Sequence, residues 1–143
     1  MPLDTWTNIF HFTADGDDGK FGDRVPALFI DNDGYFHVCS AVNNTKSYCK
    51  DINFILETQY QMAIIQYKQQ RKFWFEVIVN DERQLLTENT HPRSYSSVKL
   101  YASDPWLASF SSDLGSICNF NIRNIGNCSR VSLLQTKCYT NLT

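Results

Sequence analysis

No long apolar stretch occurs in this chain of 143 residues. A helix that spans a bilayer needs about 18 or more consecutive apolar residues, and no run in the sequence approaches that length. The first residues also lack the charged and then apolar pattern of a secretory leader. We therefore expect no insertion into a membrane, and we expect that a signal peptide precedes the chain and has been removed.

An excess of positive charge is also missing. The 13 Lys and Arg residues are outnumbered by 15 Asp and Glu residues, which gives a net charge of −2. Nucleic acids and anionic lipid surfaces are bound through clustered cations, so we expect neither as a partner. The one basic cluster, Lys68–Lys72, falls in a predicted hairpin tip, where solvated charge explains it.

Signatures of catalysis are absent as well. The sequence contains no P-loop, no Rossmann glycine fingerprint, no HExxH motif and no Gly-x-Ser-x-Gly elbow. The strand carboxylates do not form the facing pair that glycosidases use. His37 and Cys39 are two residues apart on one predicted strand, so their side chains lie beside each other rather than in line. We expect no enzyme activity.

Five cysteines are present, without a CxxC pair and without the Cys/His spacing of a zinc site. Cys39 and Cys49 bracket a polar loop, so we predict a bridge between them. Cys128 and Cys138 bracket the C-terminal tail in the same way. Cys118 is then either a buried free thiol that packs as a small hydrophobe or, like a tail cysteine, the source of a bridge to another chain.

Three Asn-x-Ser/Thr sequons accompany the cysteines, at Asn43, Asn127 and Asn141. N-linked glycans and disulfides both belong to oxidising, extracellular settings. The sequence therefore predicts a glycosylated, disulfide-bonded protein that is secreted or displayed on the cell surface.

The chain consists instead of short alternating segments. Ten Phe, seven Tyr and three Trp residues suit strands better than helices, and no segment reads as a long amphipathic helix. Turn signals separate the segments at Asp31–Gly34, Lys68–Lys72 and Asn80–Asp81, and Asn43–Asp51 is predicted to be a loop. This order is typical of an antiparallel all-β protein and not of an α/β nucleotide-binding unit.

The segment from Phe73 to Val79 alternates most clearly. Its odd-numbered residues share one face and predict a core stripe, while Trp74, Glu76 and Ile78 share the other face. Residues 1–122 read as one β-sandwich domain, closed by a last strand over Gly115–Ile122 that pairs near the N-terminal strand. Residues 123–143 form a cysteine-containing extension, either packed on the domain or leading to another module.

The order of these signals resembles the concanavalin A-like jelly rolls, a superfamily that includes laminin G-type modules, pentraxins and galectins. Three motifs are similar to a laminin G-like module of invertebrate extracellular proteins: FxFTxxxDDGxFGDRVPALF, HVCSAVNN and ENTxPRxYxxVKLYASDPW. The resemblance covers residues 6–122. It implies an antiparallel two-sheet jelly-roll sandwich in an extracellular setting.

The galectin sugar motif is missing from this pattern. Galectins read galactosides with a His-x-Asn-x-Arg strand and a Trp-x-x-Glu-x-Arg strand. Here Cys39 stands two residues after His37, and Val77 stands three residues after Trp74. The resemblance therefore implies galectin-like architecture without galactoside binding in that mode.

Four carboxylates lie within nine residues, among flexible glycines, at Asp15, Asp17, Asp18 and Asp23. Ca²⁺ takes about six to eight oxygen ligands, so calcium is the cofactor that this loop suggests, although the spacing is not that of an EF-hand. The other reading is an acidic, solvated loop stabilised by Asx turns. Laminin G-like sandwiches hold calcium at loop rims, which the resemblance carries over as an expectation.

Four other side chains are candidate ligand contacts. Trp106 is either buried in an Asp-Pro-Trp turn or exposed as an aromatic platform. Trp74 lies opposite the core stripe beside Glu76. Arg24 either forms a structural ion pair with Asp23, with its stem packed on aromatic rings, or contacts the ligand.

Together these features predict a secreted or cell-surface recognition or adhesion module that binds a protein or glycan partner non-covalently. A calcium-dependent lectin that uses the Asp15–Asp23 loop is the first alternative. The second is a structural subunit of a disulfide-linked extracellular assembly, which includes a homo-oligomer.

Overall fold

The structure is a computed structural model that describes residues 6–55, 58–103, 105–106, 108–109, 117 and 120. Within these residues the regular structure is entirely β, so the predicted all-β class is confirmed. Among them no helix has the length and apolarity of a membrane span. The strands are β1 (Thr7–Thr13), β2 (Ala27–Ile30), β3 (Tyr35–Val42), β4 (Thr45–Asn53), β5 (Met62–Gln69), β6 (Lys72–Val79), β7 (Glu82–Glu88), β8 (Lys99–Ala102) and β9 (Ala108–Ser109).

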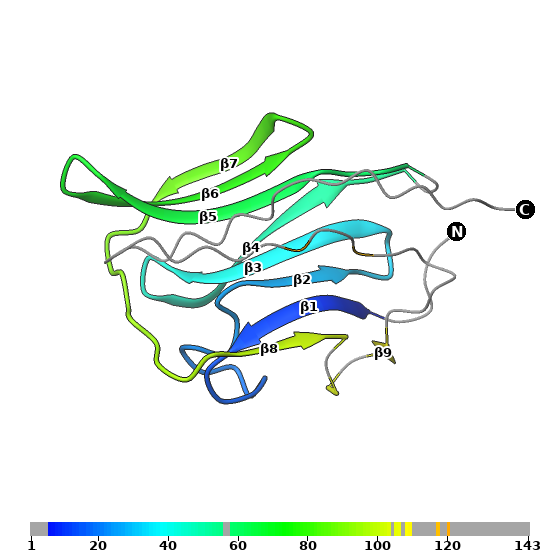
Figure 1. The fold of residues 1–143 in the computed structure, drawn as a ribbon, viewed down its shortest axis with the longest axis horizontal. Coiled ribbons are helices and arrows are strands. Elements are labelled where there is room, and N and C mark those ends of the chain that lie inside the picture. Colours follow the sequence, from blue (N-terminus) through cyan, green and yellow to red (C-terminus); the bar gives the residue numbers. More distant parts are fainter. Residues whose placement is uncertain are drawn as a thin grey trace, which may run out of the picture. The chain divides into compact units, whose positions relative to one another are not determined.

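The strands form two separate sheets (Figure 1). In the six-stranded sheet the antiparallel order is β4-β3-β2-β1-β8, and the short β9 pairs parallel with β1. The three-stranded sheet has the antiparallel order β5-β6-β7. The chain accordingly divides into two compact units, Met1–Leu56 with Asn89–Ser111 and Glu57–Glu88 with Ser112–Thr143.

Three hairpins close through two-residue turns in which both residues have positive φ. The φ pairs are 53° and 59° at Asn43–Asn44, 50° and 66° at Gln70–Arg71, and 51° and 64° at Asn80–Asp81. This is the backbone of a type I′ turn, whose twist matches that of the flanking strands. The predicted turns at Lys68–Lys72 and Asn80–Asp81 are confirmed.

The predicted loop over Asn43–Asp51 is wrong. The turn occupies only its first two residues, and β4 continues from Thr45 to Asn53. β4 is an edge strand of its sheet, and most of its residues are half-buried or exposed on both faces. An edge strand needs no alternation of apolar and polar residues, which is why its polar sequence reads as a loop.

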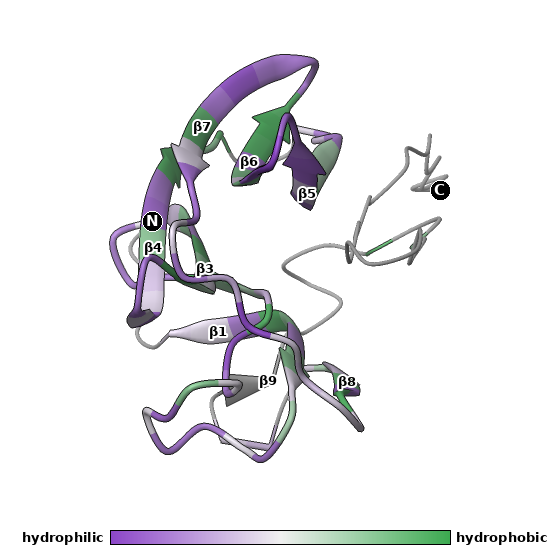
Figure 2. Ribbon diagram, turned by 90° about the vertical axis from the view of Figure 1, so that its left-hand side faces the viewer, coloured by the Kyte–Doolittle hydropathy of each residue, from purple (hydrophilic) through white to green (hydrophobic). Residues whose placement is uncertain are grey.

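The predicted core stripe of β6 is confirmed. Phe75 and Val77 have no exposed surface and Val79 is 5% exposed, while Phe73 at the strand's start is half-buried. Ile64, the partner of Val77 on β5, is 1% exposed. In Figure 2 the arrowhead end of β6 is coloured as hydrophobic. The buried apolar stripe of the three-stranded sheet therefore runs along β6 and includes Ile64 of β5.

Strand β1 is buried along its whole length, including its polar residues. A bulge between Asn8 and Phe10 breaks the regular pairing with β2. The Asn8 side chain is fully buried and donates to the carbonyl oxygens of Phe10 at 3.1 Å and Leu28 at 3.3 Å. The amide thus satisfies backbone groups that a bulge leaves unpaired.

The other edge of β1 is covered by a late segment of the chain. β8 pairs antiparallel with β1 from Phe10 to Thr13, and β9 pairs with Thr7 and Asn8. After β7 the chain therefore leaves the three-stranded sheet and adds its next strand to the six-stranded one. Apart from Ile117 and Phe120, the predicted last strand over Gly115–Ile122 and the extension over residues 123–143 lie outside the described residues.

Candidate ligand-binding face

One face of the six-stranded sheet gathers aromatic and metal-ligating side chains. Residues paired across neighbouring strands share a face, as do alternate residues along one strand. One row of paired residues across the sheet consists of Cys49, Cys39, Ala27, His11 and Tyr101. Phe29 lies two residues after Ala27, and its register partner His37 lies two residues before Cys39, so both share the face of this row.

The aromatic rings on this face form an unbroken series of contacts. The Trp6 ring centroid lies 4.7 Å from that of His37 and 6.3 Å from that of Phe29. Phe29 lies 5.8 Å from His11, and His11 lies 5.5 Å from Trp106. Tyr101 ends the series, 5.2 Å from Trp106. We call these side chains the aromatic face: Trp6, His11, Phe29, His37, Tyr101 and Trp106.

The two tryptophans are the exposed part of the aromatic face. Trp6 is 38% exposed and Trp106 is 42% exposed, whereas Phe29 and His11 between them are buried. Of the two alternatives for Trp106, the structure therefore has the exposed one; Asp104 of the same motif lies outside the described residues. The buried rings hold the two indoles in place by edge-to-face contacts.

Arg24 places a guanidinium group against this face. Its Nε and Nη2 donate to the two carboxylate oxygens of Asp17, at 2.9 Å and 3.2 Å, and its Nη1 donates to Ser47 Oγ at 3.3 Å. Its Cζ lies 4.9 Å from the Phe29 ring centroid. The side chains of Arg24 and Asp17 are 27% and 11% exposed, so the ion pair is shielded on most sides.

The predicted ion pair between Arg24 and its neighbour Asp23 is wrong, because Asp23 faces inward. Asp23 is 2% exposed, and its Oδ2 accepts from the backbone N–H of Lys20 at 2.6 Å. Its backbone oxygen is hydrogen-bonded to His11 Nε2. Its Oδ1 is buried and accepts no hydrogen bond from any described residue.

Thr13 fixes the start of the acidic loop, which runs from Asp15 to Asp23. The Thr13 hydroxyl accepts from the N–H groups of Asp15 and Gly16, at 3.1 Å and 2.8 Å, and donates to the Gly16 carbonyl. Gly22 has a φ of 99°, and a Cβ there would lie 3.0 Å from the Tyr95 ring. The loop therefore needs glycine at position 22.

The four acidic side chains of the loop point to different partners. Asp15 and Asp18 are exposed, and Asp18 is 3.1 Å from Lys20 Nζ. The hydrogen bond and negative charge of Asp18 raise the pKa of Lys20. Among the described residues, the one group of three or more metal-ligating side chains with mutually close ligand atoms lies elsewhere. Calcium at this loop stays a prediction.

Trp74 and Glu76 belong to the three-stranded sheet, on the face of β6 opposite the core stripe, as predicted. Glu76 is 7% exposed and accepts from Arg83 Nε at 2.6 Å. Trp74 is half-buried, and Lys72 Nζ lies 6.0 Å from its ring centroid. Of the four predicted ligand contacts, Trp74 and Glu76 thus lie in the three-stranded sheet, whereas Arg24 and Trp106 lie in loops of the other unit.

The predicted bridge between Cys39 and Cys49 is confirmed. The two cysteines are direct register partners on β3 and β4, and they do not bracket a loop. Cys118, Cys128 and Cys138 lie outside the described residues, so the second bridge and the interchain bridge stay predictions.

Asn43, the first predicted glycosylation site, links two segments of the first unit. Its Oδ1 accepts from the backbone N–H of Thr90 at 2.8 Å and from the Thr90 hydroxyl at 3.2 Å. Its own N–H donates to Asn89 Oδ1 at 3.0 Å. Asn127 and Asn141 lie outside the described residues, and glycosylation at the three positions stays a prediction.

Sequence reasoning missed most of the aromatic face. It identified Trp106 as a ligand contact but not Trp6, His11 or His37, because these residues come from different segments of the chain. One local signal was available. His37 and Cys39 are two residues apart and therefore share a strand face, and the bridge to Cys49 extends that face to β4. The pairing of β1 with β8, which brings in Tyr101, leaves no local pattern.

Comparison of the chain with protein-family models, with curated proteins and with solved structures found no match. Of what the resemblance to concanavalin A-like modules implies, the structure supports the all-β class and the two antiparallel sheets. The Cys39–Cys49 disulfide is compatible with an extracellular protein.

Proposed function

We propose that this chain is a secreted or cell-surface recognition module that binds a glycan non-covalently through its aromatic face. The observation that carries the proposal is the pair of exposed indoles, Trp6 and Trp106, joined by buried rings beside the Arg24–Asp17 ion pair. No covalent chemistry is part of the proposal.

The proposal includes a finer fold than two sheets. The proposed fold is a jelly-roll sandwich of the concanavalin A-like, laminin G-like type, which the sequence motifs suggest. The apolar stripe of Phe75, Val77 and Val79 supports it, because a buried sheet face of this kind has to pack against another layer. An experimental structure in which the two sheets do not face each other would contradict it.

The chemistry of the aromatic face suits a carbohydrate. An indole offers a flat apolar surface for the C–H groups of a sugar ring, and its N–H is a hydrogen-bond donor at the ring edge. The rings below Trp6 and Trp106 are buried, so the indoles lose little conformational freedom when a ligand binds. The adjacent guanidinium and carboxylate supply the polar groups that orient a ligand in a largely apolar site.

A glycan array is the first experiment, followed by calorimetry with each glycan that binds. Trp106→Ala and Trp6→Ala should each weaken binding at least about tenfold, the cost of removing one well-placed aromatic contact. Trp74→Ala is the matched control, because it removes the same side chain from the other sheet. Binding that is lost in Trp74→Ala and retained in the other two variants would contradict the aromatic face.

A protein partner is the other outcome of this test. If no glycan on the array binds, and pull-down with the intact protein captures a partner that Trp106→Ala loses, the aromatic face is a protein-recognition surface.

A calcium-dependent lectin is a second candidate, and one observation favours it. The buried Oδ1 of Asp23, in the acidic loop, lacks a hydrogen-bond partner among the described residues. Carboxylate oxygens are among the ligands that Ca²⁺ takes in proteins. Thermal melting with calcium and with a chelator tests it, since a ligand of the folded state raises the melting temperature. An unchanged melt removes calcium from the proposal.

A further inference from the structure

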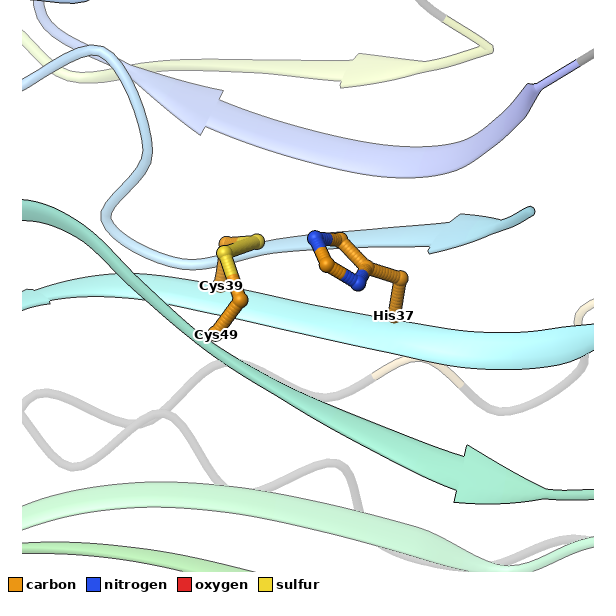
Figure 3. Close-up of side chains that lie close together, drawn as sticks. All are labelled: His37, Cys39 and Cys49. Atoms are coloured by element: carbon orange, nitrogen blue, oxygen red, sulfur yellow. A yellow bond between two sulfur atoms is a disulfide. The ribbon is translucent and has the colours of Figure 1, made fainter.

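Three metal-ligating side chains meet at one point of the six-stranded sheet, away from the acidic loop. His37, Cys39 and Cys49 each offer one ligand atom, and these atoms lie within 4.8 Å of one another. Figure 3 shows the imidazole ring turned edge-on toward the two sulfur atoms, with one ring nitrogen nearest to them. The sulfur atoms are joined as the Cys39–Cys49 disulfide.

Strand register brings this group together. His37 and Cys39 are alternate residues of β3 and share a face, and Cys49 on β4 is the direct partner of Cys39. Backbone pairing fixes all three Cα positions. Opening the disulfide therefore leaves the two sulfur atoms and the imidazole as neighbours on the sheet.

The imidazole is already oriented for a metal. His37 Nδ1–H donates to Asp51 Oδ1, and Asp51 is the register partner of His37 on β4. In the neutral ring, this hydrogen bond puts the proton on Nδ1 and leaves the lone pair on Nε2, the nitrogen on the other side of the ring. A carboxylate that orients a histidine in this way is the usual outer partner of a zinc ligand.

We propose that the reduced form of this protein binds Zn²⁺ through Cys39, Cys49 and His37, with Asp51 as the orienting outer residue. A dithiol reductant gives two electrons and two protons to the disulfide; it becomes a disulfide itself and leaves two thiols on the protein. Zn²⁺ then displaces both thiol protons and binds two thiolates and one imidazole. A water molecule takes the fourth position of the tetrahedron.

The geometry and charge of the group agree with this assignment. At about 2.3 Å for Zn–S and about 2.0 Å for Zn–N, tetrahedral ligand atoms lie about 3.3–3.8 Å apart. These distances are below 4.8 Å, the limit within which the three ligand atoms lie. Two thiolates and a neutral imidazole balance the charge of Zn²⁺. Arg24 Nη1 is 4.0 Å from Cys39 Sγ, and its positive charge is offset by the carboxylate of Asp17.

Access to the disulfide is one-sided. Cys39 has no exposed surface, whereas Cys49 is half-buried. An external thiolate therefore attacks the Cys49 sulfur, and the Cys39 sulfur is the leaving group.

The experiment uses Co²⁺ as the spectroscopic probe and the full chain in which Cys118, Cys128 and Cys138 are replaced by Ser, so that no other cysteine binds metal. After treatment with a dithiol, the reduced protein should bind one Co²⁺ with thiolate charge-transfer absorption and tetrahedral d–d bands. Zn²⁺ should displace the Co²⁺ and bleach these bands, because it binds such sites more tightly.

Three variants in the same background test the assignment. His37→Ala should weaken Co²⁺ binding at least about 100-fold, and Asp51→Asn should weaken it about 10- to 100-fold. His91→Ala is the matched control, since His91 is exposed and lies on the segment after β7, and it should bind as the parent does. Circular dichroism of each oxidised variant checks that it folds.

Four outcomes would overturn the proposal. The disulfide resists the dithiol until the protein unfolds; the reduced, folded protein binds no Co²⁺; His37→Ala binds as tightly as the parent; or reduction unfolds the chain and Co²⁺ does not restore its strand spectrum. Refolding of a reduced, unfolded chain by stoichiometric Co²⁺ would support it, because the metal is then coupled to folding.

Discussion

The two sheets of this protein bury their residues in different ways. In the three-stranded sheet, β6 alternates, with Phe75, Val77 and Val79 on one apolar face. In the six-stranded sheet, all seven residues of β1 are buried, and one face carries histidines, a disulfide and an arginine ion pair. The first sheet has an apolar face that mainly stabilises the fold. The second combines buried polar groups with two exposed indoles.

The two sheets also differ in the partners of their buried polar groups. Glu76 in the three-stranded sheet is satisfied by Arg83, whose side chain is 59% exposed. In the six-stranded sheet, Asn8 and His11 are fully buried and bonded to backbone oxygens. Buried polar groups of this kind fix one arrangement of the surrounding strands, which in turn positions the exposed indoles.

A charge in the apolar stripe should give the largest loss of folding free energy. If the variant folded, the three-stranded sheet would not depend on its apolar stripe as the comparison requires. Val77→Asp puts an unpaired carboxylate at a fully buried position, which costs about 3–5 kcal/mol or more of folding free energy. We expect no cooperative thermal transition by circular dichroism. Leu86→Asp, at a position 38% exposed on the neighbouring strand, is the control and should fold.

Loss of the disulfide should come next. The bridge joins residues 10 apart in sequence, and a loop of that length predicts about 3 kcal/mol of stabilisation from the unfolded state. The double variant Cys39→Ser, Cys49→Ser should lose that amount in denaturant titration. Peptide mass spectrometry of the unreduced wild type should find the two cysteines linked. A free thiol at Cys39 would reject the bridge.

The two sheets should respond differently to the loss of an ion pair. Arg24→Ala removes hydrogen bonds to Asp17 in a shielded site, which we expect to cost about 2 kcal/mol. Lys72→Ala removes the pair with Glu88, where the side chains are 56% and 34% exposed, and should cost less than about 1 kcal/mol. Equal losses of folding free energy in denaturant titration would show that shielding does not make the Arg24–Asp17 pair stronger than the Lys72–Glu88 pair.

Tyr95 should give the smallest effect at neutral pH. Burial raises the pKa of Tyr95, partly opposed by the charge of Arg93, and its buried hydroxyl lacks a hydrogen-bond partner in the described residues. The folded state holds this proton more tightly than the unfolded state, so its contribution is intact below pH 10.0 and is lost as the pH rises above it.

Tyr95→Phe should therefore change stability by less than about 1 kcal/mol at neutral pH and remove part of the loss above pH 10.0. Denaturant titrations on both sides of that pH measure it. Tyr35→Phe, at an exposed position, is the control and should leave the alkaline loss as in the wild type.

Local patterns predicted the hairpins and the core stripe, because both depend on neighbouring residues. Asn80–Asp81 is a turn signal in itself, and Val77 and Val79 lie two residues apart. β4 was missed because an edge strand carries no apolar alternation. The aromatic face was missed because His37, His11 and Tyr101 meet only through pairings between distant strands. Local sequence patterns did reveal the Cys39–Cys49 bridge beside that face and one of its members, Trp106.

The position of β1 between β2 and the late strand β8 has a consequence for biosynthesis. Phe10 pairs with Ala102, so a chain that leaves the ribosome N-terminus first has made nearly all of this sheet before the second edge of β1 is covered. Until then, an unpaired edge rich in phenylalanine is available to other nascent chains. Such non-local pairing also slows folding, so β1 stays exposed on that edge until β8 has been made.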